Sequence, residues 1–213
     1  MIKKILILFL LLNGFSSNAQ FKYLFSNTKK KIRCIDTAQR KLSFDSIGWT
    51  ISIPVNYYLN NDSVINSMLK NGTDIWDSLT GLNVSRESHT LFVASKPFDN
   101  NITALVLSYK GKPQFWTTLR NIEKQLFLTA LKYSQKDNSF DSSSSVEIID
   151  GKQYDKFLVD ITLPDSRVLH IVDYAKCDNN CILEILYTYM YKEEGDALED
   201  SVKKSYFYNP VQH

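Results

Sequence analysis

Few side chains in this chain have the type and spacing that acid–base chemistry needs. The 213 residues include three histidines, His89, His170 and the terminal His213. His170 alternates with Val168 and Val172 as in a strand, so we expect it to be a structural or surface residue. Counting does not exclude a Ser–His–acid set, but no Gly-x-Ser-x-Gly turn, phosphate loop or His-Glu-x-x-His motif occurs. The sequence therefore predicts no catalytic, cofactor-binding or metal-binding residue.

Cysteine is the second reactive side chain. Cys177 and Cys181 enclose Asp178-Asn179-Asn180, which are turn residues between two apolar runs. A three-residue hairpin loop would place the two cysteines opposite each other, within disulfide range. We therefore predict a Cys177–Cys181 disulfide. The alternatives are two free thiols and a metal-binding pair. No His or acid cluster completes a metal site with these cysteines. Cys34 is left over and is either free or bonded between chains.

Aromatic residues form the main candidate binding surface. Tyr187, Tyr189 and Tyr191 occupy every second position of one expected strand, so they share a face of the sheet. Together with Trp49 they could line a ligand groove or form an exposed binding surface. The alternative is that the amphipathic helix of this chain covers the tyrosine face and makes it part of the core.

Short acidic motifs offer candidate modification sites. Five Asp-Ser/Thr-apolar triplets match a pattern that some Gram-negative bacteria O-glycosylate after export, although a three-residue motif has low specificity. They begin at Asp36, Asp45, Asp62, Asp77 and Asp200.

The first residues have the organisation of a secretory signal peptide. Lys3 and Lys4 precede the apolar run 5–12, and residues 17–19 supply the small side chains of a cleavage site. The run is shorter than the roughly 20 apolar residues that a membrane-spanning helix needs. We therefore expect residues 1–19 to be removed and the protein to be periplasmic or secreted, without membrane insertion.

Loss of this leader changes the charge. Lys+Arg falls from 25 to 23 while Asp+Glu stays at 23, because the leader contains two lysines and no acid. A neutral chain lacks the basic footprint that nucleic acid or anionic lipid requires. Seven glycines are also few for a nucleotide site. We expect no cofactor and no nucleic acid, and an unidentified protein as partner.

Hydrophobic periodicity predicts the elements that position these residues. Residues 20–40 are expected to form an N-terminal extension and residues 41–213 a single α+β domain. A short helix is expected after Asp62. The expected strands are 49–53, 90–95, 101–109, 146–150, 153–163, 167–176 and 182–191, of which the last four form an antiparallel meander, and the longer helices are 115–133 and 196–204.

Helix 115–133 is the clearest element. It carries an apolar stripe that we expect to face the core, and the opposite face carries basic residues that include Arg120 and Lys124. Residues 137–145 are expected to be a polar, serine-rich loop. The stripe consists of Phe115, Leu119, Ile122, Leu126, Ala130 and Tyr133.

This chain resembles the PsbP-like fold over roughly residues 44–208. The likeness is carried by the opening strand 47–54, the hairpin 149–154, and an ending in which Asp196-Ala197-Leu198 leads to Ser205-Tyr206-Phe207. The resemblance implies a central antiparallel sheet sandwiched by helices in α/β/α layers. It supplies no catalytic residue, since members of the group are mostly non-catalytic, such as the accessory protein of photosystem II, a nuclear-transport factor and exported bacterial proteins of unknown role.

These observations favour an exported, non-catalytic protein that binds a partner, as an accessory protein of the bacterial envelope. One alternative is an immunity-type protein that blocks a delivered toxin. The other is a secreted hydrolase that uses an unrecognised serine or histidine.

Overall fold

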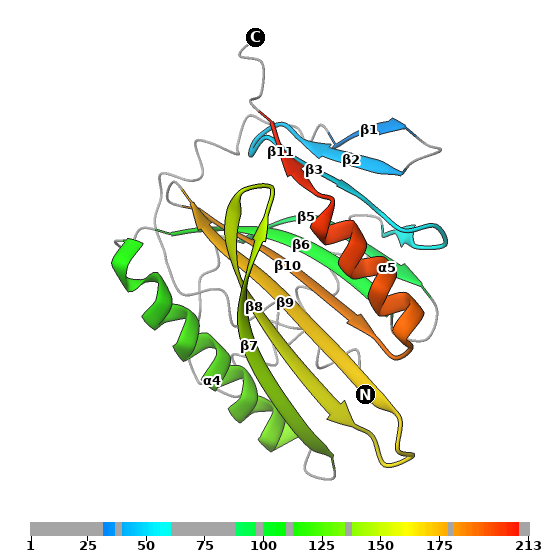
Figure 1. The fold of residues 1–213 in the computed structure, drawn as a ribbon, viewed down its shortest axis with the longest axis vertical. Coiled ribbons are helices and arrows are strands. Elements are labelled where there is room, and N and C mark those ends of the chain that lie inside the picture. The colour runs from blue at the N-terminus through cyan, green and yellow to red at the C-terminus, as the bar shows by residue number, and fades with distance from the viewer. Residues whose placement is uncertain are drawn as a thin grey trace.

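The computed structural model describes residues 32–36, 40–60, 88–96, 100–109, 113–134, 138–178 and 181–208. They form two antiparallel sheets and two α-helices, an α+β arrangement (Figure 1). The expected signal peptide 1–19 and the expected short helix after Asp62 lie outside the described residues.

The larger sheet has seven strands in the order β4-β5-β6-β10-β9-β8-β7. All neighbours in it are antiparallel, and β7 to β10 form the expected meander. The strand β6 lies between β5 and β10, and Ile102, Leu105 and Val106 are all buried in it, which confirms that it is central. The bounds are β4 Tyr58–Leu59, β5 Ser88–Lys96, β6 Asn100–Ser108, β7 Ser139–Ile149, β8 Lys152–Thr162, β9 Val168–Asp178 and β10 Cys181–Tyr189.

The serine-rich segment is part of this sheet, so the prediction of a loop over residues 137–145 was wrong for most of its length. Every residue of β7 pairs with β8, from Ser139 opposite Thr162 to Ile149 opposite Lys152. The side chains of Ser142 to Ser145 are exposed. A strand with polar residues on both faces has no two-residue period, and only its ladder of hydrogen bonds to β8 defines it.

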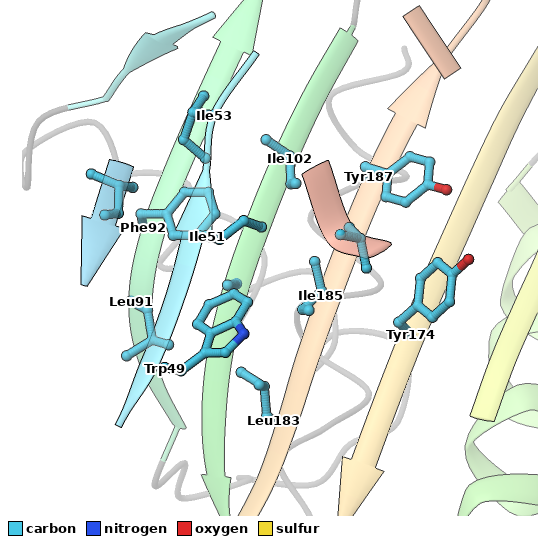
Figure 2. Packing of buried hydrophobic residues seen from close by; sticks show 14 of the residues in the cluster. Trp49, Ile51, Ile53, Leu91, Phe92, Ile102, Tyr174, Leu183, Ile185 and Tyr187 are labelled. Atoms are coloured by element: carbon cyan, nitrogen blue, oxygen red, sulfur yellow. The ribbon is translucent and has the colours of Figure 1, made fainter. Parts of the chain in front are cut away.

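The smaller sheet covers part of one face of the larger one. Its order is β1-β2-β3-β11, with β1 Ile32–Asp36, β2 Lys41–Phe44, β3 Trp49–Ser52 and β11 Tyr206–Phe207. Trp49 and Ile51 point from β3 toward Ile102 and Ile185 of the larger sheet in one buried apolar cluster (Figure 2).

The helices lie on opposite faces of the larger sheet. The helix α4, Trp116–Ser134, follows a 3-10 turn at Pro113–Phe115. Its Phe127 and Leu131 pack with Val159, Ile171 and Leu186.

The helix α5, Lys192–Lys203, starts four residues before the position expected from the sequence. Its Leu198 and Val202 join the cluster around Trp49 on the other face. The layers therefore differ from the expected helix–sheet–helix sandwich, since the smaller sheet and α5 together cover the face opposite α4.

Candidate functional site

The four aromatic residues proposed as a binding surface are not exposed together. Trp49 and Tyr187 are fully buried, Tyr189 is half-buried, and only Tyr191 is exposed. The tyrosine face is covered, but by the smaller sheet and α5, because the amphipathic helix α4 packs on the other side. An exposed tyrosine ladder is therefore excluded.

The tyrosines and His170 instead form a row of packed rings. Tyr187 lies 6.3 Å from Tyr174 and 6.1 Å from Tyr189, centroid to centroid, and the ring of His170 stacks on Tyr189 at 4.5 Å. The Nδ1 atom of His170 is 2.7 Å from Oδ1 of Asp160. In the described part of the chain, His170 thus contacts an acid and a tyrosine ring rather than a serine or cysteine nucleophile, which agrees with a structural role.

The predicted disulfide is absent, and both Cys177 and Cys181 are free thiols. The register places Cys177 opposite Ile182 and Cys181 opposite Asp178. Directly opposed residues share a face of the sheet, so the two cysteines point to opposite faces. Cys177 packs with Ile182 and Trp116 on the α4 side, whereas Cys181 packs on the side of α5. The hairpin is one residue tighter than the three-residue loop that the prediction assumed.

The candidate glycosylation triplets differ in accessibility. Ser46, in the triplet that begins at Asp45, is exposed in a turn. Ser201 is buried in α5 and donates a 3.0 Å hydrogen bond to the carbonyl of Ala197, so the triplet at Asp200 is closed to modification in the folded chain.

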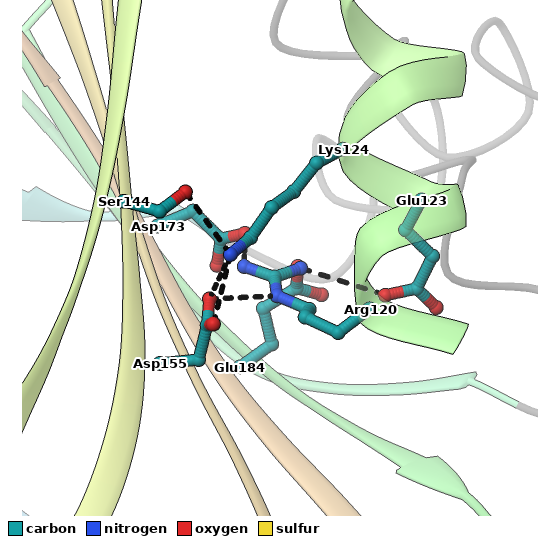
Figure 3. Close-up of polar contacts among 7 residues, drawn as sticks. All are labelled: Arg120, Glu123, Lys124, Ser144, Asp155, Asp173 and Glu184. Atoms are coloured by element: carbon teal, nitrogen blue, oxygen red, sulfur yellow. Dashed lines mark hydrogen bonds and ion pairs between the residues drawn. The ribbon is translucent and has the colours of Figure 1, made fainter. Parts of the chain in front are cut away.

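A buried ion cluster lies between α4 and the larger sheet (Figure 3). The prediction that Arg120 and Lys124 decorate the outer face of this helix was wrong, because they are only 2% and 7% exposed. Ile122, from the predicted core stripe, is 52% exposed. The cluster comprises Arg120, Glu123 and Lys124 of α4, Asp155 of β8, Asp173 of β9 and Glu184 of β10.

Strand register brings the three strand acids together. Asp155 pairs with Ala175, and Ala175 pairs with Glu184, so these three residues form one row across β8, β9 and β10. Asp173 lies two positions before Ala175 on the same face of the sheet. Ala175 lies between Asp155 and Glu184 in this row, and the guanidinium of Arg120 contacts the acids on both sides of it.

The two cations connect all four acids. Arg120 donates to Asp173 through Nη2 and to Asp155 through Nε at 3.2 Å. Its Nη1 atom lies 3.5 Å from Glu123 Oε2 and 3.6 Å from Glu184 Oε1.

Lys124 links the cluster to the edge of the sheet. Its Nζ donates to Oδ2 of Asp155 at 2.8 Å and to Oγ of Ser144, in β7, at 3.2 Å. The helix is therefore tied to the last two strands of the sheet as well as to its centre.

The cluster has two more acids than bases, and its burial shifts their protonation. Burial raises the pKa of Glu123 to about 7, against the opposing effect of Arg120. Burial also raises the pKa of Asp173, which Arg120 again opposes. Burial alone would lower the pKa of Arg120, but Asp173 and Glu184 raise it above its ordinary value. At neutral pH the cluster can hold a proton on a carboxyl group while Arg120 stays charged.

No group of three or more His, Cys, Asp or Glu in the described ranges is arranged to hold a metal ion. Of the helices that the structure describes, none combines the length and apolar character of a membrane span.

The second candidate site is the outer edge of β7. Among the described strands, β7 pairs with β8 alone and so forms one edge of the larger sheet. It is 11 residues long, whereas β4, the strand at the opposite edge, has two residues. Val146 and Ile148 are 59% and 67% exposed beside this edge. Long edge strands in natural proteins are usually protected by charged side chains, Pro or a bulge. The strand β7 contains no Lys or Pro and pairs without a bulge, and its two charged residues are Asp141 and Glu147.

Sequence reasoning missed both sites. A usable signal for the cluster was a single acid inside an apolar run, as at Asp173 between Val172 and Tyr174, because such an acid must be paired when buried. For the edge no signal was available, since exposed serines occur in loops as readily as in edge strands.

No protein-family model matches the chain, and no curated protein matches it in sequence. Solved structures match its fold. The solution structure of cyanobacterial PsbP (CyanoP) from Synechocystis sp. superposes with a TM-score of 0.52 at 11% identity, over 79% of this chain and 91% of that one. The fold is therefore PsbP-like, as the resemblance of the sequence implied.

Two further structures show weaker likeness. LpqN, described as involved in cell envelope biogenesis of Mycobacterium tuberculosis, has a TM-score of 0.41 at 10% identity over 74% of this chain and 82% of its own. A protein of Bacteroides thetaiotaomicron has a TM-score of 0.39 at 12% identity over 81% of this chain and 49% of its own. At such identities the likeness concerns the fold and not the function.

Proposed function

We propose that this protein is an exported, non-catalytic binding protein of the bacterial envelope that binds its partner by strand addition to β7. The observation that carries the proposal is the 11-residue edge of β7, which pairs with β8 alone among the described strands and has Val146 and Ile148 exposed beside it. An extended segment that adds to such an edge gains main-chain hydrogen bonds, and its alternate side chains meet the two flanking apolar residues.

The buried ion cluster supports this function by fixing the edge in place. Lys124 bridges Ser144 of β7 and Asp155 of β8, so α4 restrains both strands on one face of the sheet. The contact uses the side chain of Ser144. At the outer edge the backbone N–H of Ser142 donates to Oδ1 of Asp141 at 2.8 Å, and an added strand would replace that bond. A rigid edge loses little conformational entropy on binding, which favours affinity.

Export and lack of catalysis are supported separately. The charged leader, apolar run and small-residue exit over residues 1–19 favour secretion. The packed contacts of His170 with Asp160 and Tyr189 favour a structural histidine.

The test compares two lysine substitutions of exposed aliphatic residues. Val146→Lys places a charge beside the β7 edge, and Ile122→Lys places the same charge on the exposed side of α4. We expect immobilised wild-type protein and Ile122→Lys to retain the same partner from an envelope extract, and Val146→Lys to lose it.

Hydrogen–deuterium exchange on the purified complex should show slower exchange in the 139–149 peptide than in the free protein. Retention of the partner by Val146→Lys, or binding that leaves exchange in β7 unchanged, would contradict the proposal.

A further inference from the structure

Resting on the proposed function, we infer that the strand that adds to β7 is β7 of a second copy of this chain, antiparallel about a two-fold axis at Ser143. Among the described strands the outer edge of β7 has no partner strand, and the order of side chains along β7 suits pairing with itself. It makes the larger sheets of two copies continuous.

The two faces of the sheet restrict the possible registers. The two-fold axis of such a pair is perpendicular to the sheet, so the α4 face of one copy continues as the α4 face of the other. Residues opposite each other must then share a face. On β7 the even-numbered residues lie on the α4 side, because Ser144 contacts Lys124 there. One residue of β7 must therefore lie opposite its own copy, with the axis midway between the two. Registers in which the axis falls between two successive residues are excluded.

Charge excludes the register centred on Ser144. That register sets Asp141 of each copy opposite Glu147 of the other, and like charges directly opposite destabilise a strand pair. Moving the axis to Ser143 sets Asp141 opposite Ser145 and Glu147 opposite Ser139. The two acids are then both opposite neutral side chains, and β7 contains no other charged residue.

Apolar complementarity selects Ser143 over Ser145. With the axis at Ser143, Phe140 of each copy lies opposite Val146 of the other on the α4 face, an aromatic–β-branched pair of the kind that stabilises sheets. With the axis at Ser145, Val146 lies opposite Ser144 and Phe140 opposite Asp150. Val146 is 59% exposed in the single chain, and the favoured register covers it in both copies.

The centre of the pair suits a symmetric contact. Ser142 opposes Ser144 of the other copy, and Ser143 opposes itself, so only short side chains meet where the backbones approach. A two-fold interface must be self-complementary, and a strand with small residues at its centre and one apolar residue on each side satisfies that condition.

The test uses cysteine and lysine substitutions at exposed serines in the full mature chain. Ser143→Cys places two cysteines directly opposite, with Cα atoms about 4.5–5.5 Å apart and therefore within disulfide range. Ser145→Cys is the matched control, since its two copies are offset by four residues, or about 13 Å. Ser143→Lys sets two like charges at the axis, and Thr118→Lys on the exposed side of α4 is its control.

We expect wild type and Thr118→Lys to be dimers by analytical ultracentrifugation, and Ser143→Lys to associate at least about tenfold more weakly. Mild oxidation should form a disulfide between the two copies of Ser143→Cys at residue 143, which peptide mapping identifies. The two copies of Ser145→Cys should form no disulfide at residue 145. Circular dichroism establishes that each variant is folded.

Several results would overturn the inference. They are a wild-type chain that is monomeric up to about 0.1 mM, a dimer that Ser143→Lys leaves intact, and a link through residue 145 in place of 143. If a monomeric wild type still captures another protein in a manner sensitive to Val146→Lys, the inference fails while the proposed function stands. If a dimer forms through some other surface and Val146→Lys has no effect on binding, both fail.

Discussion

The guanidinium of Arg120, on α4, donates to the carboxylate of Asp173, on β9, and both side chains are buried between the helix and the sheet. The two residues are 53 positions apart in the chain. A helix of this kind usually packs through apolar residues alone. Here the middle of the contact consists of ions, with apolar packing by Trp116 and Leu119 before it and by Phe127 and Leu131 after it along the helix.

Replacing Arg120 should therefore be strongly destabilising. Arg120→Met leaves Asp173 and Glu184 buried without their cation, which typically lowers the free energy of unfolding by about 3–5 kcal/mol. Urea denaturation followed by circular dichroism measures the change. The control is Lys192→Met, because Lys192 and its partner Asp196 are both exposed and solvent-exposed ion pairs contribute little to stability. Equal losses for the two variants would show that the cluster does not fasten α4.

Glu123 should make stability depend on pH. Its pKa is about 7 in the folded chain, against the ordinary 4.5, chiefly because it is buried. Between these values the folded state keeps a proton that the unfolded state has lost, so the stabilisation by this group falls as pH rises from 4.5 to 7 and stays low above that. We expect wild type to lose about 2 kcal/mol more than Glu123→Gln between pH 5 and pH 8. Parallel urea midpoints for the two proteins across this range would contradict the assignment.

Gly195 should be intolerant of a side chain even though it lies in a helix. A Cβ atom added there would lie 2.5 Å from Cε2 of Tyr189, whose ring stacks on His170. Alanine usually favours a helix over glycine by about 1 kcal/mol, but this overlap should reverse the sign and reduce stability by about 1–3 kcal/mol.

The companion variant Tyr189→Leu removes the ring that Gly195→Ala would meet. Thermal unfolding of the two single variants and the double variant forms a double-mutant cycle. We expect the double variant to lose less stability than the sum of the two singles. Additive losses would mean that the ring and the glycine do not restrict each other.

Cys177 and Cys181 should be unlinked thiols, and Cys177 should react slowly. Burial, with Cys181 as a smaller cause, raises the pKa of Cys177 to about 11, so little thiolate exists at pH 8. We expect iodoacetamide to modify Cys177 slowly in the native protein and rapidly after unfolding. Peptide mapping without reductant gives the answer directly, since a Cys177–Cys181 linked peptide would restore the disulfide predicted from the sequence.

Much of the secondary structure followed from local patterns. The two-residue alternation of Trp49 and Ile51, the doubly apolar run from Ile102 to Leu107, and the turn at Asp150-Gly151 each predicted an element that the structure contains. Gly151 and Asp150 both have positive φ in that turn, which explains why these residue types occur there. Such features depend on neighbours within a few residues, and the sequence records them directly.

The sequence by itself determined where β3, β6, β8 to β10 and α4 lie, that the class is α+β, and that the last strands form a meander, because backbone geometry ties residue spacing to secondary structure. Only the tertiary structure decided which face of α4 is buried. Arg120 and Lys124 can leave water only where carboxylates from separate strands meet them, and that meeting depends on the register that aligns Asp155, Ala175 and Glu184. Only the tertiary structure also decided that the serine-rich segment is the edge strand β7, because its pairing with β8 defines it and its own sequence has no strand pattern.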